Sequence, residues 1–148
     1  MKLESNSFQK GGEIPRKYGY KKDNVNPHLI IKDVPSHAKS LALIMDDPDA
    51  MKAVGRLWIH WLVWNIDPKT TEIKENSVPE NSIQGKTDFG EISYGGPAPP
   101  DKEHLYIFKL YALDSELSLK NGSTKEQLEE AMKNHIISEA RLEGKYAP

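Results

Sequence analysis

Three short stretches hold the side chains best suited to chemistry, and the first is a run of carboxylates. In Asp46-Asp-Pro-Asp49, three carboxylates lie within four residues. Like charges at this spacing repel one another, so the cluster is costly unless another group uses it. Asp and Pro are also ordinary turn residues, so this stretch alone predicts a turn at the end of a strand.

The second stretch is Trp58-Ile-His60-Trp61, inside the most apolar run of the chain. Strand alternation predicts that His60 faces one side of a sheet while Ile59 and Trp61 face the other. A buried imidazole needs a polar partner, and the preceding carboxylates would supply one if the two strands are neighbours. A core histidine with a purely structural hydrogen bond is the alternative interpretation.

The third stretch is the loop Tyr94-Gly-Gly-Pro-Ala-Pro-Pro100, which leads into His104-Leu-Tyr106. Consecutive glycines let the backbone approach a ligand closely, and prolines stiffen the rest of the loop. Rigid loops with oriented N–H groups make good anion sites. An imidazole and a phenol two positions apart also project to one face of a strand. A proline-rich connector, or a polyproline segment bound by another protein, is the alternative.

In this order and at this spacing, the stretches resemble the signature regions of the phosphatidylethanolamine-binding protein family, also called Raf kinase inhibitor proteins. The match is closest to the bacterial and archaeal branch. Asp47-Pro-Asp49-Ala50 and Trp58–Trp61 match the first signature, and Tyr94–Pro100 with His104–Tyr106 matches the second. The resemblance covers nearly the whole chain.

Three departures from the family pattern lie close to the signatures. Met51 stands where the family usually has a proline, and Leu105 replaces an arginine. The connector Asp101-Lys-Glu103 is short and carries no glycine. None of these changes removes a residue that the resemblance assigns to the pocket, although the rim of the pocket is expected to differ in shape.

The resemblance implies a mainly β fold, an antiparallel Greek-key β-sandwich with one or two peripheral C-terminal helices. It also implies a pocket for phosphate, phosphorylated headgroups or small carboxylates. A hydrogen bond from His60 to Asp47 would raise the pKa of the ring and make imidazolium available to an oxyanion. The residues expected to line this pocket are Asp47, Asp49, His60, Gly96, Ala98, His104 and Tyr106.

The apolar runs and one helical stripe predict the elements that would position these residues. After Ser123 or Thr124 as a cap, with Glu126 or Gln127 as the capping-box partner, the period becomes helical. This pattern predicts a helix over 124–138, followed by a short terminal segment over 140–146. The helical stripe consists of Leu128, Ala131, Met132, His135 and Ile136, and the expected strands are Leu29–Ile31, Ser40–Met45, Trp58–Ile66 and Leu105–Leu113.

Length and composition indicate one soluble globular domain spanning residues 1–148. The chain is 37% hydrophobic and 28% charged, with a formal net charge of -2, as expected for an ordinary folded domain. No basic tract suggests nucleic acid as a partner. The absence of cysteine excludes disulfides, a Cys-ligated zinc site and a cysteine nucleophile.

The chain shows no targeting or membrane-spanning signal. Its N-terminus, MKLESNSFQK, lacks the apolar core of a signal peptide. The run Leu57–Ile66 is far shorter than the roughly 20 residues that a membrane span needs. We therefore expect a cytoplasmic protein without a transmembrane segment and without a cofactor.

Three functional interpretations remain open from the sequence. The first is a non-catalytic protein that binds a small anion, with regulation of a kinase or another partner as its expected role; the resemblance also allows a homodimer. The second is a phosphoester or ester hydrolase that uses His and Asp as general acid and base, although no serine lies in a G-x-S-x-G elbow. The third is a metal site built from Asp47, Asp49, His60 and His104.

Overall fold

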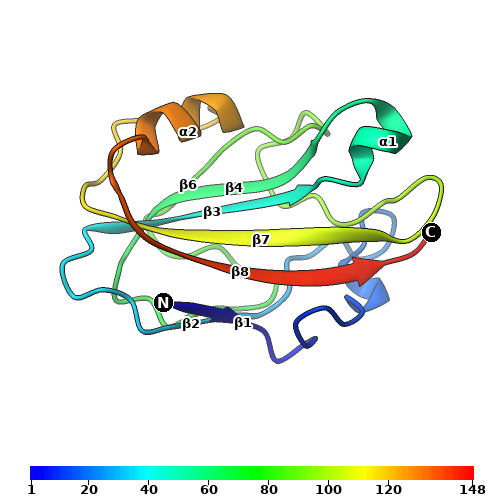
Figure 1. Ribbon diagram of the computed structural model, residues 1–148, viewed down its shortest axis with the longest axis horizontal. Coiled ribbons are helices and arrows are strands. Elements are labelled where there is room, and N and C mark those ends of the chain that lie inside the picture. Colours follow the sequence, from blue (N-terminus) through cyan, green and yellow to red (C-terminus); the bar gives the residue numbers. More distant parts are fainter.

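The computed structural model describes residues 1–148 and is mainly β (Figure 1). Two antiparallel sheets have the strand orders β6-β4-β3-β7-β8 and β1-β2-β5. The predicted fold class is confirmed. The strands are β1 (Lys2–Glu4), β2 (Leu29–Lys32), β3 (Ser40–Asp47), β4 (Trp58–Ile66), β5 (Glu72–Ile73), β6 (Ile83–Gln84), β7 (His104–Leu113) and β8 (Ile136–Tyr146). The helices are α1 (Ala50–Val54), α2 (Lys125–Met132) and a 3-10 turn, η1 (Arg16–Tyr18).

The larger sheet is organised around β3, which pairs antiparallel with both β4 and β7. After β4 the chain forms β5 in the smaller sheet and then β6 at the edge of the larger one. It next crosses to β7, which pairs with β3 and not with β6. This crossover is the Greek-key step. The strands predicted over 29–31, 40–45, 58–66 and 105–113 are confirmed as β2, β3, β4 and β7.

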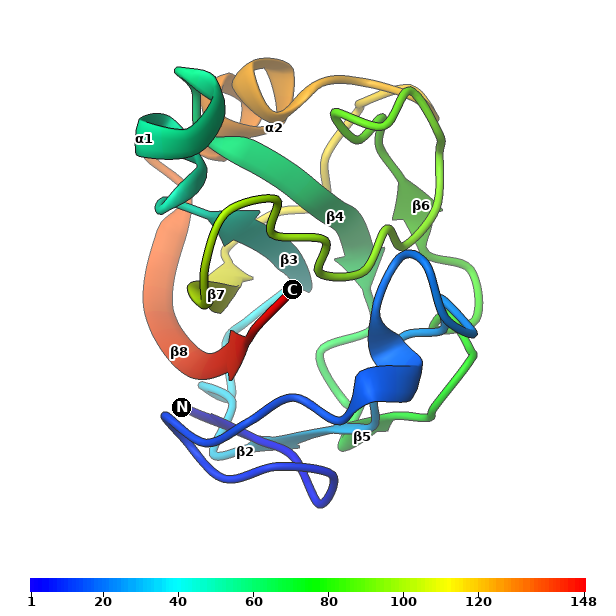
Figure 2. The same ribbon diagram turned by 90° about the vertical axis from the view of Figure 1, so that its right-hand side faces the viewer.

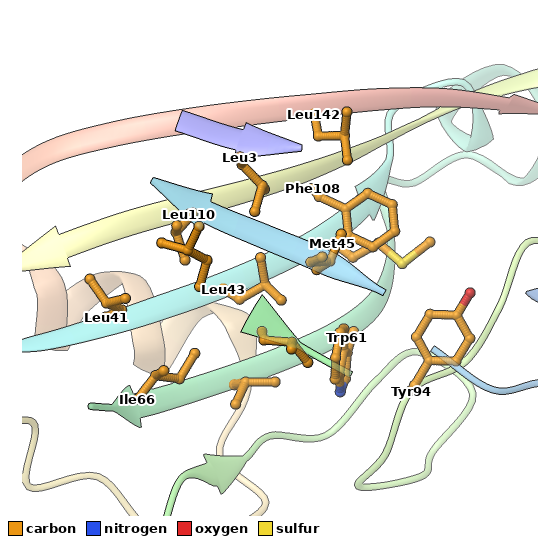
Figure 3. Packing of buried hydrophobic residues seen from close by; sticks show 14 of the residues in the cluster. Leu3, Leu41, Leu43, Met45, Trp61, Ile66, Tyr94, Phe108, Leu110 and Leu142 are labelled. Carbon is orange, nitrogen blue, oxygen red and sulfur yellow. The ribbon is translucent and has the colours of Figure 1, made fainter. Parts of the chain in front are cut away.

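Two apolar clusters lie on opposite faces of the five-stranded sheet. The larger fills the space between the two sheets, where Trp61 and Phe108 are fully buried (Figure 3). The smaller lies beneath α2, where Leu62 and Trp64 pack with Leu128. Burying a leucine or phenylalanine side chain contributes about 1.5–3 kcal/mol. Burial on both faces explains why β3 and β4 are continuous apolar runs rather than alternating ones.

A β-bulge interrupts the pairing of β3 with β4 near the end of β3. Met45 pairs with Trp61, but the next residue, Asp46, pairs with Ile59. Ile59 consequently packs in the cluster beneath α2, whereas Trp61 packs in the cluster between the sheets. The predicted placement of these two residues on one face is therefore wrong. The bulge turns His60 toward the inner face of the sheet.

Helix α2 begins at the predicted cap but ends early. The hydroxyl of Thr124 accepts the N–H of Gln127 at 3.2 Å, and the Gln127 side chain accepts the N–H of Thr124 at 2.9 Å. The prediction of a helix to residue 138 is wrong, because the helix ends at Met132. Asn134 then adopts the left-handed conformation, with φ of 68°, and Ile136 begins β8. None of the helices has the length and apolar character to cross a bilayer.

The segment after α2 is a full strand rather than the end of a helix. β8 pairs with β7 over its whole length, with Tyr146 opposite His104 at one end. The predicted short terminal segment over 140–146 is therefore part of this strand. His135 does not join an apolar stripe; its Nδ1 lies 2.7 Å from Asp114 Oδ1 at the surface. The helix was predicted too long because the apolar residues of α2 and of the start of β8 follow the same helical spacing.

Replacing Thr124 by alanine removes the side-chain acceptor at the start of α2. We expect the free energy of unfolding to fall by about 1 kcal/mol. Thr124→Ser keeps the hydroxyl and is expected to remain within roughly 0.5 kcal/mol of the wild type. Urea denaturation followed by tryptophan fluorescence measures both variants, and an equal loss in the two would contradict the capping role.

Candidate functional site

A cavity of about 220 Å³ lies at the end of the five-stranded sheet where β3 finishes and β4 and β7 begin. Figure 2 looks onto this end, where α1 and the loop before β7 surround the strand ends. The cavity therefore collects residues from five separate parts of the chain. Its lining consists of Asp47, Ala50, Ala53, Val54, Trp58, His60, Phe89, Ala98, Pro100, His104 and Tyr106.

His60 is buried in the cavity wall as a neutral ring. Its Nδ1 lies 2.6 Å from the carbonyl oxygen of Gly95, and because a carbonyl only accepts, Nδ1 carries the proton. Burial lowers the pKa of His60 to about 4, despite the hydrogen bond to Gly95. The predicted hydrogen bond to Asp47 and the predicted imidazolium are therefore wrong. Nε2 has no hydrogen-bond partner in the protein, which leaves its lone pair available at the cavity.

His104, not His60, is the partner of Asp47. The ring of His104 has no exposed side-chain surface, and its Nδ1 lies 2.7 Å from Asp47 Oδ2. Its Nε2 lies 2.7 Å from Asp101 Oδ1. Burial opposes the charged ring, but the hydrogen bonds to the two carboxylates outweigh it, so the pKa of His104 is raised. Both ring nitrogens are thus occupied, and His104 has no N–H left for a ligand.

The hydroxyl of Tyr106 is buried at the cavity without any hydrogen-bond partner. Burial and the charge of Asp47 raise the pKa of Tyr106 far above its ordinary value, so the hydroxyl stays neutral and can donate. The carboxylate of Asp47 and the backbone of Ala98 both approach this hydroxyl, but neither forms a hydrogen bond to it. The indole Nε1 of Trp58, another cavity residue, is also buried and unpartnered. Unpaired buried donors are costly, so a ligand that accepts hydrogen bonds would be stabilised here.

Two residues expected in the pocket do not reach the cavity. Asp49 Oδ2 accepts the backbone N–H of Leu105 at 2.8 Å, which ties the turn after β3 to the start of β7. The N–H of Gly96 donates to Asn24 Oδ1 at 2.8 Å. A side chain at Gly96 would collide with the backbone of Tyr18, so this glycine serves loop packing. Asp47, His60, Ala98, His104 and Tyr106 do line the cavity; their role in binding an anion stays a prediction.

The apolar part of the lining was not found from the sequence. α1 supplies Ala50, Ala53 and Val54, and only the short Ala-rich run after Asp49 hinted at a helix there. Phe89 comes from a loop and stacks on the ring of Tyr20 with centroids 3.9 Å apart. Nothing in the sequence around Phe89 marks it as a pocket residue, because its contacts are made only by the tertiary fold.

The proposed metal ligands do not converge. No group of three or more His, Asp or Glu side chains is arranged to hold a metal ion. His60 binds a carbonyl, and Asp49 binds the backbone of β7. The metal interpretation of Asp47, Asp49, His60 and His104 is therefore not supported by their geometry.

Comparison with known proteins gives a match over nearly the whole chain. A family model described as phosphatidylethanolamine-binding protein matches residues 4–147. A relative from Methanothermobacter thermautotrophicus, named UPF0098 protein, is 44% identical and spans 99% of this chain and 98% of its own length. The similarity thus includes every element that lines the cavity.

Two solved structures share the fold. CT736 from Chlamydia trachomatis, described as a homologue of phosphatidylethanolamine-binding protein, has a TM-score of 0.91 and 45% identity, covering 98% of this chain and 95% of its own. YbcL from E. coli, described as a new member of the mammalian family, has a TM-score of 0.90 and 28% identity, covering 98% and 96%. These similarities agree with the family resemblance of the signature regions.

The unpartnered hydroxyl of Tyr106 yields a stability prediction. Tyr106→Phe removes a buried group without a partner, so we expect the free energy of unfolding to rise by about 1 kcal/mol in buffer without oxyanions. Tyr94→Phe is the matched control, because the Tyr94 hydroxyl is buried and donates to the carbonyl of Tyr18 at 2.9 Å. We expect that variant to lose about 1 kcal/mol. Chemical denaturation measures both, and equal losses would rule out an orphaned hydroxyl at Tyr106.

Proposed function

Because this chain belongs to the phosphatidylethanolamine-binding protein family, we propose that it binds a small oxyacid such as a phosphate monoester and does not convert it. The observation that carries the proposal is the buried, unpartnered hydroxyl of Tyr106 at the cavity. An oxygen atom of the ligand would accept this proton. Notably, the same oxygen would also lie near the amide of Ala98.

The pocket favours a ligand that still carries one proton. His60 Nε2 is a lone-pair acceptor, and the carboxylate of Asp47 lies in the same wall. A fully ionised phosphate would meet both of these acceptors without a proton to share. A singly protonated phosphate ester can instead accept from Tyr106 and donate to His60 or Asp47. Binding is therefore expected to tighten at lower pH, because the ligand takes up a proton and not because a histidine does.

Positive charge lies beside the pocket rather than inside it. No lysine or arginine lines the cavity. An adjoining groove of about 340 Å³ contains Arg16, Lys21 and Lys22, and it shares Ala98 and Pro100 with the cavity wall. Cations at the mouth would attract an anion from solution and raise its association rate. The neutral donors inside would then select among the anions that arrive.

The apolar wall provides contact area for the rest of the ligand. The rings of Trp58 and Phe89 meet edge to face, with centroids 5.6 Å apart, and both line the cavity. Three small side chains of α1 complete this wall. An ester with a compact apolar or aromatic substituent fits these surfaces. An ammonium group, as in phosphoethanolamine, would instead meet the carboxylate of Asp47.

The lining supports binding over phosphoryl transfer. Hydrolysis of a phosphoester needs positive charge at the transferring group, and the cavity contains neither lysine nor arginine. It also contains no serine or threonine that could act as a nucleophile. His60 retains the lone pair of a general base, but nothing beside it would stabilise the developing charge. The sequence also predicts a kinase or other protein partner, a homodimer and a cytoplasmic location. These remain predictions, because the pocket geometry concerns only the small ligand.

Phenyl phosphate and phenyl sulfate test the role of the ligand proton. Phenyl sulfate resembles the singly protonated phosphate in shape and charge but has no proton to donate. The second pKa of a phosphate monoester is about 6, so we expect phenyl phosphate to bind roughly 20-fold more tightly at pH 5.5 than at pH 7.5. Phenyl sulfate reports any titration of the protein itself, and we expect its binding to be weaker and to change much less with pH than that of phenyl phosphate. Calorimetric titration measures both ligands.

Equal affinity for the two ligands, or tighter phosphate binding at higher pH, would contradict the proposal.

Tyr106→Phe tests the hydroxyl itself. Because this variant is expected to stabilise the free protein, a loss of affinity cannot come from unfolding. We expect its affinity for phenyl phosphate to fall about 10-fold, as for the loss of one hydrogen bond. Unchanged affinity would remove Tyr106 from the site.

Neutralising Lys21 and Lys22 tests the contribution of the groove. We expect the Lys21→Gln, Lys22→Gln double variant to bind phenyl phosphate with a few-fold lower association rate at low salt, because electrostatic steering is lost. The difference should vanish near 1 M salt, where the screening length is about 3 Å. Stopped-flow tryptophan fluorescence measures the rates, with Lys10→Gln as a control outside the groove. A changed dissociation rate with an unchanged association rate would place these lysines in direct contact with the ligand.

A further inference from the structure

One wall of the cavity is attached to the protein by a single polar contact. Between Pro97, whose carbonyl accepts the N–H of Tyr20 at 2.9 Å, and the start of β7, the chain runs through Ala98–Glu103. Within that segment, Asp101 makes the one hydrogen bond to the rest of the protein, at 2.7 Å to His104. The amide of Ala98 approaches the hydroxyl of Tyr106 without forming a hydrogen bond.

This single contact depends on the proton count of the His104 ring. Nδ1 faces a carboxylate of Asp47 and Nε2 faces a carboxylate of Asp101, each at 2.7 Å. A carboxylate only accepts, so both contacts require a doubly protonated ring. A neutral imidazole donates one hydrogen bond and turns a lone pair toward the other carboxylate. One of the two contacts must then be lost.

The carboxylates of Asp47 and Asp101 differ in how easily each can separate from the ring of His104. The Asp47 side chain is 4% exposed, at the end of β3, and its Oδ1 also accepts the N–H of Ala50 at 3.2 Å. The Asp101 side chain is 42% exposed, in a stretch whose neighbours Lys102 and Glu103 are also exposed. A released Asp101 regains hydration, whereas a released Asp47 would not. The neutral ring therefore keeps Asp47 and gives up Asp101.

We propose that Asp101 is a positioning residue, which holds the Ala98–Pro100 wall of the pocket closed through His104 and releases it when the ring loses one proton. Its consequence for the ligand rests on the proposed function, since Ala98 and Pro100 line the cavity. With the wall closed, the amide of Ala98 stays beside Tyr106. With the wall released, a bound oxyacid loses that side of its enclosure and dissociates faster.

The charged and titratable groups around His104 favour the closed form at neutral pH. From β3 and the loop, Asp47 and Asp101 hold the proton on the ring and raise its pKa. From β4, His60 is neutral, because burial lowers its pKa to about 4. From β7 itself Tyr106 is neutral, and from β8 Tyr146 lies opposite His104 in the strand pairing. The wall is therefore closed below the raised pKa of His104 and opens as the pH rises through it.

Nitrogen-15 NMR of the histidine rings in the free protein tests the proton count directly. We expect both His104 nitrogens to show imidazolium shifts at pH 6.5, with one transition above that pH. The backbone amides of Ala98 and Lys102 should shift with the same midpoint. A ring that is already neutral at pH 6.5, or wall amides that titrate independently of it, would overturn the proposal.

Asp101→Asn removes the charge that holds the second proton. We expect the midpoint of His104 to fall by roughly one pH unit, together with the midpoints of Ala98 and Lys102. Asp101→Glu restores a carboxylate and should move the midpoint back toward the wild-type value. Glu103→Gln removes a charge from the same loop without a contact to the ring and should leave it unchanged. Equal shifts in Asp101→Asn and Glu103→Gln would reduce the effect to general electrostatics and overturn the assignment.

Ligand dissociation links the wall to the pocket. We expect the dissociation rate of phenyl phosphate to rise several-fold as His104 titrates, and the midpoint of this rise to move down in Asp101→Asn. The pKa of phenyl phosphate is the same whether the wild type or Asp101→Asn is measured. A difference between the two midpoints of the dissociation rate is therefore caused by the wall. Dissociation with one midpoint in both proteins would overturn the gating of the ligand. If phenyl phosphate does not bind at any pH while the ring and wall titrate together, the proposed function fails and the wall mechanism stands.

Discussion

The bulge between β3 and β4 is the constraint on which the pocket depends. It places an extra residue of β4 at the point where β3 ends, so His60 turns inward beside Tyr106, with ring centroids 5.1 Å apart. Regular pairing would have directed His60 toward the outer face, under the helices. The end of β3 also separates two adjacent carboxylates. Asp46 binds Lys109 at 2.8 Å on the outer face, while Asp47 binds His104 on the inner face.

Burial, rather than net charge, sets the chemistry of this site. Desolvation keeps His60 neutral and prevents ionisation of Tyr106, so the cavity offers one hydroxyl donor and one nitrogen acceptor. The charged histidine is enclosed between two carboxylates and does not contact the cavity space through an N–H group. An anion would therefore be held here only through hydrogen bonds, by accepting one from the Tyr106 hydroxyl and donating one to His60 Nε2. Under the proposed function, such a site would discriminate by the number of protons on the ligand more than by its charge.

Much of the fold followed from the sequence because burial leaves a clear pattern there. The four apolar runs became β2, β3, β4 and β7, and the capping box at Thr124 marked the start of α2. The end of α2 was missed because one apolar period continues from the helix into β8, across the left-handed Asn134. Most of the residues expected in the pocket line the cavity, but periodicity could not reveal the bulge. Consequently His60 was expected to be the partner of Asp47, whereas the structure pairs Asp47 with His104. Asp101 was expected only as part of a connector.

The protonation state of His60 tests the central claim most directly. In this account the ring is neutral at pH 7, carries its proton on Nδ1 and presents Nε2 to the ligand. Nitrogen-15 NMR of the ring during addition of phenyl phosphate at pH 6 should show a neutral Nδ1–H tautomer whose Nε2 resonance shifts on binding, as it accepts a hydrogen bond. An imidazolium ring in the free protein, or an Nε2 resonance that does not respond to the ligand, would contradict the account.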